Sequence, residues 1–262
     1  MNKLIFVGMT LLASTNVAAH SSMCDYSLDY NIKITQEQIS FNKPGGKELI
    51  FSGDKLIVGG KALRLNDEQK EASRAFQQGT RQILPKVTEI AVEGAELGVK
   101  AATLAVTSLF GEDEEVYFDL IKPIEDIAAK VKANVDRNYL NTTQLESSFD
   151  NEFDKEIEAL ISKAMSKYSG KMAGQIIESI FSSNSEEAKD FKFRMENLEQ
   201  DIEAYVEGNA NALEIKAKSL CKDFASLAKH DEQLEKVTGF PNEGIIRQGA
   251  QNGLKMSNLD IY

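Results

Sequence analysis

The spacing of the apolar residues changes at Asn66, and no other feature constrains the fold of this 262-residue chain as strongly. Before that position, in the stretch DYSLDYNIKI (25–34), apolar and polar residues alternate as they do in a half-buried strand. Short apolar segments follow, separated by the pairs Gly45-Gly46, Gly53-Asp54 and Gly59-Gly60, which suit tight hairpins. Residues 20–65 are therefore predicted to form an antiparallel meander of about four strands.

From Asn66 onward the apolar period is helical. Gln69 follows Asn66 at the spacing of a capping box, which marks the start of a helix. Later in the chain, an apolar seam of the kind found in coiled coils predicts a helix of roughly 40 residues, about 60 Å long. Its members repeat at spacings of four and three, with a skip in phase after Asn209: Phe191, Met195, Leu198, Ile202, Tyr205, Asn209, Leu213, Ala217, Leu220, Phe224 and Leu227. A second apolar stripe, between residues 145 and 181, can pack against this seam.

The meander and the helices are expected to form one domain, because so small a sheet is marginally stable by itself. We therefore predict an α+β fold in which a small N-terminal antiparallel β meander packs on a bundle of long amphipathic helices, residues 66–238. Residues 239–262 are rich in Gly and Asn and show no sustained period. They are predicted to be a flexible tail whose few apolar residues can dock on a partner.

The first 19 residues have the features of a secretory signal peptide. Lys3 precedes an apolar run, and small residues at Val17 and Ala19 fit the signal peptidase. The run is too short to span a bilayer, which needs roughly 20 apolar residues. Cleavage after Ala19 leaves His20 as the first residue of an exported, soluble protein with no transmembrane span. A lipid anchor on the first cysteine is disfavoured, because Met23 occupies the position where a lipoprotein signal needs a small residue.

The two cysteines of the chain, Cys24 and Cys221, are predicted to form a disulfide, since an exported chain meets an oxidising compartment. A loop of nearly 200 residues closed in this way stabilises the fold by about 5 kcal/mol at most. The alternative is a pair of redox-active thiols. Such thiols usually lie two residues apart at the start of a helix, and these two do not.

The sequence contains no recognisable catalytic or cofactor-binding constellation. Its two histidines, His20 and His230, have no partners that would complete a triad, and neither a nucleotide-binding glycine motif nor an HExxH motif is present. The acidic run GEDEEVYFD (111–119) could hold Ca²⁺, but it lacks the spacing of a calcium loop and reads as the first turn of a helix. The predicted cofactor and metal content is therefore none. A formal net charge of −11 opposes binding to nucleic acid.

The stretch VTEIAVEGAELGVKAATLAVTSLF (87–110) has one helix face made of small residues. The members of this small-residue face that we single out as a ligand or partner surface are Ala91, Gly94, Gly98, Ala101 and Ala105. A mid-helix glycine costs about 1 kcal/mol relative to alanine, so a compensating contact is expected. Close helix packing inside the bundle is the favoured interpretation, with residues 169–181 as a mate. The alternative is a cavity wall for an apolar ligand, or a surface that meets a partner.

Three parts of the sequence together suggest a family. These are the signal peptide followed at once by a cysteine, the stretch FSGDKLIVGGKALRLNDEQKEASRAFQQGTRQILP (51–85), and the late helical cysteine in AKSLCKDFASL (217–227). The chain resembles, over roughly residues 20–230, the YggN-like family of uncharacterised Gram-negative periplasmic proteins. The resemblance implies a periplasmic location and no known activity.

The leading functional hypothesis is a non-enzymatic periplasmic protein that binds another envelope protein, as an adaptor or a chaperone. The first alternative is a carrier of an apolar ligand such as a fatty acid or lipid. The second is a hydrolase that uses carboxylates alone, for which the sequence nominates no pair of residues.

Overall fold

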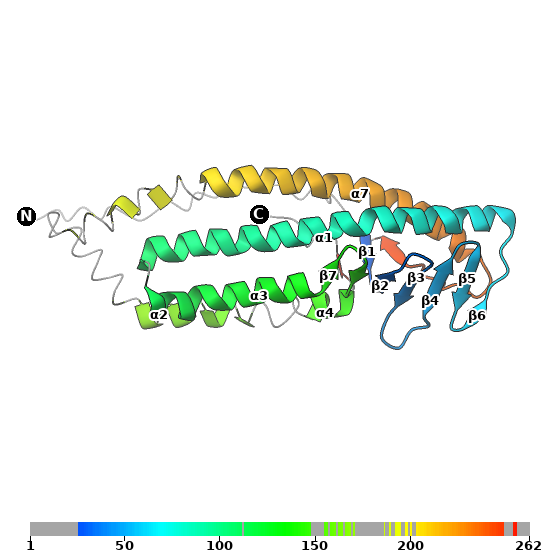
Figure 1. Cartoon of the computed structure of the whole chain (residues 1–262), viewed down its shortest axis with the longest axis horizontal. Helices are drawn as coiled ribbons and strands as arrows, with labels where there is room; N and C mark the ends of the chain where they lie inside the picture. Colours follow the sequence, from blue (N-terminus) through cyan, green and yellow to red (C-terminus); the bar gives the residue numbers. More distant parts are fainter. Residues whose placement is uncertain are drawn as a thin grey trace, which may run out of the picture.

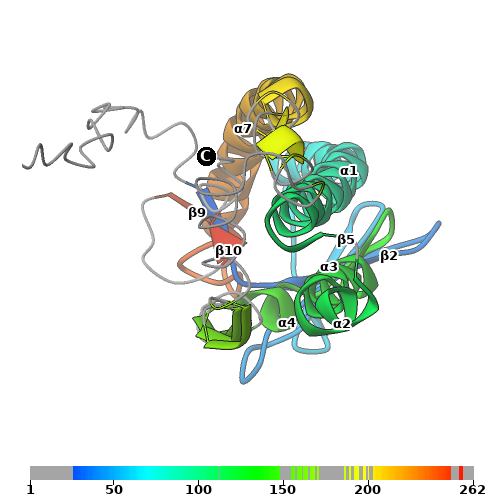
Figure 2. The ribbon, with the colours of Figure 1, turned by 90° about the vertical axis from the view of Figure 1, so that its left-hand side faces the viewer.

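The computed structural model has a head built from strands and an arm built from helices, which extends away from it (Figure 1). The structure describes residues 26–111, 113–147, 203–248 and 254–255, together with separate positions between 155 and 200. Three helices, α1 (Asp67–Phe110), α3 (Lys122–Ala133) and α7 (Gly208–Glu235), run side by side along the arm. Viewed from the end of the arm, α1 lies between α7 and α3 (Figure 2). The predicted α+β class, with an N-terminal antiparallel meander packed on long helices, is confirmed.

The larger sheet of the head has seven strands in the order β6-β5-β4-β3-β2-β8-β7, and every pairing in it is antiparallel. The meander within it consists of β2 (Asn31–Ile34), β3 (Ile39–Asn42), β4 (Leu49–Ser52), β5 (Lys55–Val58) and β6 (Lys61–Ala62). The sheet continues beyond β2 with a hairpin of β7 (Val135–Asp136) and β8 (Tyr139–Leu140). This hairpin was predicted to be helical, and its two-residue strands are too short to produce a recognisable period.

A second, three-stranded sheet places β1 (Tyr26–Leu28) between β9 (Ile246–Gln248) and β10 (Leu254–Lys255). The alternating stretch 25–34 was expected to be one strand, but the chain passes from one sheet to the other between β1 and β2. The predicted alternation still holds across that break, because Leu28, Tyr30 and Ile32 are all buried.

The start of the expected flexible tail is part of this second sheet. Phe240, Ile245 and Ile246 are buried, and β9 pairs with β1 in antiparallel register. The structure therefore differs from the prediction over residues 240–248. The apolar side chains there that were expected to meet a partner pack instead on the protein's own core.

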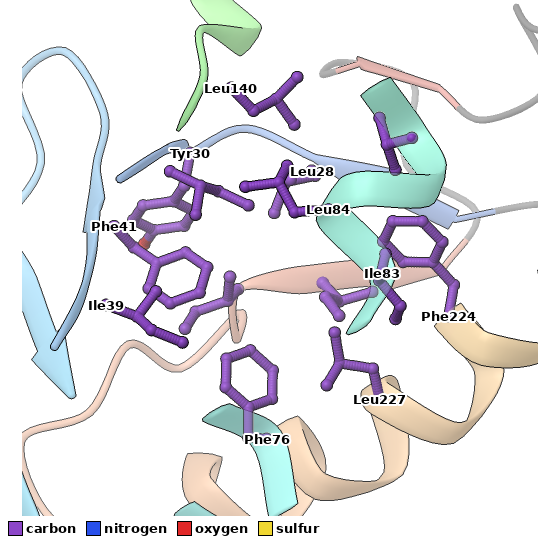
Figure 3. Packing of buried hydrophobic residues seen from close by; sticks show 14 of the residues in the cluster. Leu28, Tyr30, Ile39, Phe41, Phe76, Ile83, Leu84, Leu140, Phe224 and Leu227 are labelled. Carbon is purple, nitrogen blue, oxygen red and sulfur yellow. The ribbon is translucent and has the colours of Figure 1, made fainter. Parts of the chain in front are cut away.

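The core of the head lies between the larger sheet and the helices α1 and α7. Phe76 of α1 is fully buried, with its ring centroid 5.7 Å from that of Phe41 and 5.3 Å from that of Phe51. Figure 3 shows Leu227 of α7 beside Phe76, with Phe41 of the sheet farther away in the same cluster, so that α7 also contributes to this core. A cavity of only about 20 Å³ remains inside this core.

Helix α1 begins with the predicted capping box. The Asn66 side chain accepts a hydrogen bond from the Gln69 backbone at 2.9 Å, and the Gln69 side chain accepts one from the Asn66 backbone at 3.0 Å. The helix then continues for 44 residues, with Pro85 inside it. It packs against α7 through core side chains, and Lys216 bridges the two helices to Glu89 and Glu93 at 2.6 Å.

The last long helix is described in full from residue 203 onward. Helix α7 has 28 residues, and the π-helix η3 (Glu203–Glu207) directly precedes it. This wider turn explains the skip in phase, because Tyr205 and Asn209 are exposed while Val206 and Ala210 pack against the core. Most of the seam before residue 203, and most of the stripe at 145–181, lie outside the described residues.

Candidate functional site

The predicted small-residue face lies along α1 in the arm. Ala91, Gly94, Ala101 and Ala105 are partly buried, and Gly98 is exposed. A Cβ added at Gly94 or Gly98 would meet no described atom within 4 Å. The two glycines are therefore not needed for close contact with any described element. The mate proposed for this face, residues 169–181, lies almost entirely outside the described part of the chain.

A groove of about 330 Å³ opens between α1 and α3, on the side of α1 opposite the small-residue face. Small and apolar side chains, among them Val99, Ala128 and Ala129, form part of its lining. Both charge signs are present along it, and the Lys132 ammonium lies 2.8 Å from the Glu96 carboxylate. The remaining lining residues are Lys100, Thr103 and Glu125. This groove was not predicted from the sequence, although the small side chains of Ala128 and Ala129 leave room beside α3.

The far end of the arm contains a charged clamp around Asp119. This residue lies in the π-helix η1 (Tyr117–Ile121), which joins the short helix α2 (Glu114–Val116) to α3. Its carboxylate accepts hydrogen bonds from Lys163 at 2.8 Å, from Lys167 at 2.5 Å and from the Tyr168 hydroxyl at 2.9 Å. These donors hold the pKa of Asp119 far below its ordinary value, and the bond to Asp119 raises the pKa of Lys167.

A small apolar cluster lies beneath this clamp and fixes its position. The buried side chains of Phe110, Val116, Leu120 and Tyr168 form it, with the rings of Phe110 and Tyr168 5.2 Å apart. Burial, together with the hydrogen bond to Asp119, raises the pKa of Tyr168. Hydrogen bonds of the clamp and apolar contacts of the cluster therefore both attach η1 to the helical residues around 163–168.

Two aromatic rings are exposed on the outer side of this end. The wider turn of η1 turns Val116, Leu120 and Ile121 inward, and it leaves Tyr117 37% and Phe118 59% exposed. The two exposed rings lie 5.3 Å apart, edge to face. The Tyr117 hydroxyl donates to the Glu125 carboxylate at 2.7 Å, which raises the pKa of Tyr117.

Acidic residues precede and follow this aromatic pair in the chain. The predicted interpretation of the acidic run as a helix start agrees with the structure, since Asp113 caps α2 by accepting from the Glu115 backbone at 2.8 Å. Asp113, Glu114 and Glu115 are all exposed. Within the described part of the chain, no group of three or more His, Cys, Asp or Glu side chains is placed to hold a metal ion.

The predicted disulfide is described at one of its two ends. Cys221 is partly buried against the main core, and the described residues include no free thiol. Cys24 lies outside the described residues, so the pairing itself stays a prediction. The strand β1 starts two residues after Cys24 and contacts α7, which carries Cys221.

The fold and these surfaces define a class: an elongated α+β protein with a filled head and a helical arm that displays aromatic side chains at its end. A family model described as "Protein of unknown function (DUF2884)" matches residues 24–241, and the chain belongs to this family. The match confirms the expected membership of an uncharacterised family. Comparison with curated proteins gave no match, and comparison with solved structures gave none. Among the described residues, no helix combines the length and the hydropathy of a membrane span.

Proposed function

We propose that this protein is an exported, periplasmic, non-enzymatic binding protein that attaches to another envelope protein through the end of its arm. The observation that carries the proposal is the exposed pair Tyr117 and Phe118, presented on a π-helix that the Asp119 clamp holds in place. Exposed aromatic rings on a rigid support bind partners well, because little conformational entropy is lost when they are buried.

The chemistry around the two rings favours a cationic partner segment. Asp113 and Glu114 are exposed beside the pair, and Glu125 accepts from one of its rings. Lysine or arginine side chains could lie over the rings and reach these carboxylates at the same time. The formal net charge of −11 supports the same choice of partner and disfavours nucleic acid.

Export is proposed from the N-terminal residues. Cleavage after Ala19 releases a chain in which Cys24 and Cys221 pair, and the contact between β1 and α7 supports that pairing. Such a bond would tie the second sheet to α7 and limit opening of the head.

The proposal is tested with a photo-crosslinking amino acid placed at Phe118 in the full chain, in cells. A matched probe at Ile215, which is 69% exposed on α7, controls for general exposure. We expect a defined adduct at position 118 and none at position 215. Tyr117→Ala, added to the chain that carries the probe at position 118, should make the adduct several-fold weaker. Equal labelling at both positions, or none at 118, contradicts the proposal.

A carrier of an apolar ligand is the second candidate, and only the groove between α1 and α3 favours it. Ligand sites usually enclose roughly 300–1,000 Å³, and this groove lies at the lower limit, whereas the cavity inside the head is far too small. Organic extraction of the purified protein followed by mass spectrometry tests this candidate. A co-purified lipid that the groove-filling variant Ala129→Phe no longer carries supports it, and an empty extract contradicts it.

A further inference from the structure

One carboxylate in the head is buried, and no cation among the described residues pairs with it. Asp231, in the last turns of α7, is 1% exposed. Its Oδ2 accepts hydrogen bonds from the backbone amides of Ile245 at 2.6 Å and Ile246 at 2.7 Å, while its Oδ1 has no hydrogen-bond partner among the described residues. The side chain therefore connects α7 to the segment that leads into β9.

This connection leaves no space for a larger residue. Gly244 has a φ of +67°, and a Cβ at this position would overlap Glu235 Oε1 and lie 2.6 Å from Asp231 Oδ2. Both carboxylates thus lie against the same glycine. Residues 244–248 continue directly into the pairing of β9 with β1, so the position of Asp231 decides how firmly the second sheet is attached.

The groups that face Asp231 are mostly acidic. Glu232 and Glu235 lie on its own helix, and both disfavour its charged form. From the other side come Tyr30 and Glu243; burial, together with the charges of Asp231 and Glu243, raises the pKa of Tyr30.

The nearby cation on β9 is engaged by other carboxylates. Arg247 pairs with Asp29 and lies 3.4 Å from Glu243. Burial of Asp231 raises its pKa to about 7, against the opposing effect of the two amide hydrogen bonds.

We propose that Asp231 is a pH-responsive latch, which holds residues 244–248 on α7 when it is protonated and loosens them when it is charged. A protonated carboxyl keeps a carbonyl oxygen for the two amides and no longer buries a charge beside Glu235. On release of the segment, Asp231 returns to water and to its ordinary pKa of 3.8. Attachment of the segment therefore takes up a proton between about pH 4 and pH 7. It weakens as the pH rises through this range and levels off above pH 7.

The test measures hydrogen-exchange protection at the amides of Ile245 and Ile246, corrected for the intrinsic pH dependence of exchange. In the full chain we expect protection to fall by about 100-fold between pH 5 and pH 8.5. Asp231→Asn keeps the acceptor and removes the charge, so protection in this variant should not depend on pH. Asp223→Asn, on the same helix but paired with Lys86 at the surface, is the matched control and should behave as the unaltered chain does.

Flat protection in the unaltered chain, or an unchanged slope in Asp231→Asn, overturns the proposal. If Asp231→Asn fails to fold, the same measurement on Glu235→Gln tests the proposal. Removal of this neighbouring negative charge should move the midpoint of the pH dependence to lower pH, and an unmoved midpoint overturns the latch.

Discussion

The packing of the head can be tested most directly at Phe76. This ring is fully buried and lies between the sheet and α1, in contact distance of Phe41 and Phe51. Truncation of a buried phenylalanine to alanine costs about 3–5 kcal/mol, from lost transfer free energy and from the cavity that remains. Its two aromatic neighbours add edge and stacking contacts, so we expect Phe76→Ala to lower the free energy of unfolding by about 4 kcal/mol.

The assay is urea denaturation at pH 7, monitored by circular dichroism. An unchanged slope of the free energy of unfolding against urea concentration shows that the unfolding transition is the same. Phe118→Ala is the matched control, because it deletes the same side chain at a position that is 59% exposed. This control should change the free energy of unfolding by less than about 0.5 kcal/mol. A loss below about 2 kcal/mol for Phe76→Ala, or equal losses for both variants, would refute the described core.

Three further outcomes follow from single contacts. Gly244→Ala puts a residue with a Cβ in a left-handed backbone conformation and presses that Cβ against two carboxylates. It should lower the free energy of unfolding by more than about 2 kcal/mol in the same assay, and a neutral result would contradict the described loop. Asn66→Ala removes the cap of α1 and should cost about 1 kcal/mol, with no change in protection at residues 245–246; a loss near zero would argue against the capping box. Unfolded but unreduced protein should take up no alkylating tag at Cys24 or Cys221, and two tags only after reduction; tags without reduction would disprove the disulfide.

The sequence predicted local structure well wherever the period extended over several residues. Alternation in residues 25–34 identified the buried side chains Tyr30 and Ile32, although the two strands in this stretch, β1 and β2, belong to different sheets. The cap at Asn66 was identified from two residues at the right spacing. In both cases the prediction depends only on residues that are close together in the chain, and a sequence pattern contains that information.

The candidate surfaces could be predicted only in part. The small-residue face was identified, but the groove on the opposite side of α1 needs α3 as its second wall. The exposed ring of Phe118 was not predicted, because the pattern of so short a segment does not show which of its apolar side chains the rest of the fold will cover. The π-helix that carries it is hydrogen-bonded through Asp119 to Lys163, Lys167 and Tyr168, which lie more than 40 residues away in the chain.

The amino-acid order alone determined which side of each strand and helix is apolar, where α1 begins, and how acidic the surface is. The tertiary structure decided what those apolar sides cover: the hairpin that lengthens the sheet, the attachment of β9 to β1, and the burial of Asp231. The physical reason is that periodicity arises from the geometry of a few consecutive residues. Pairing of distant strands and desolvation of a carboxylate depend instead on which segments meet, and this is settled only when the whole core is packed.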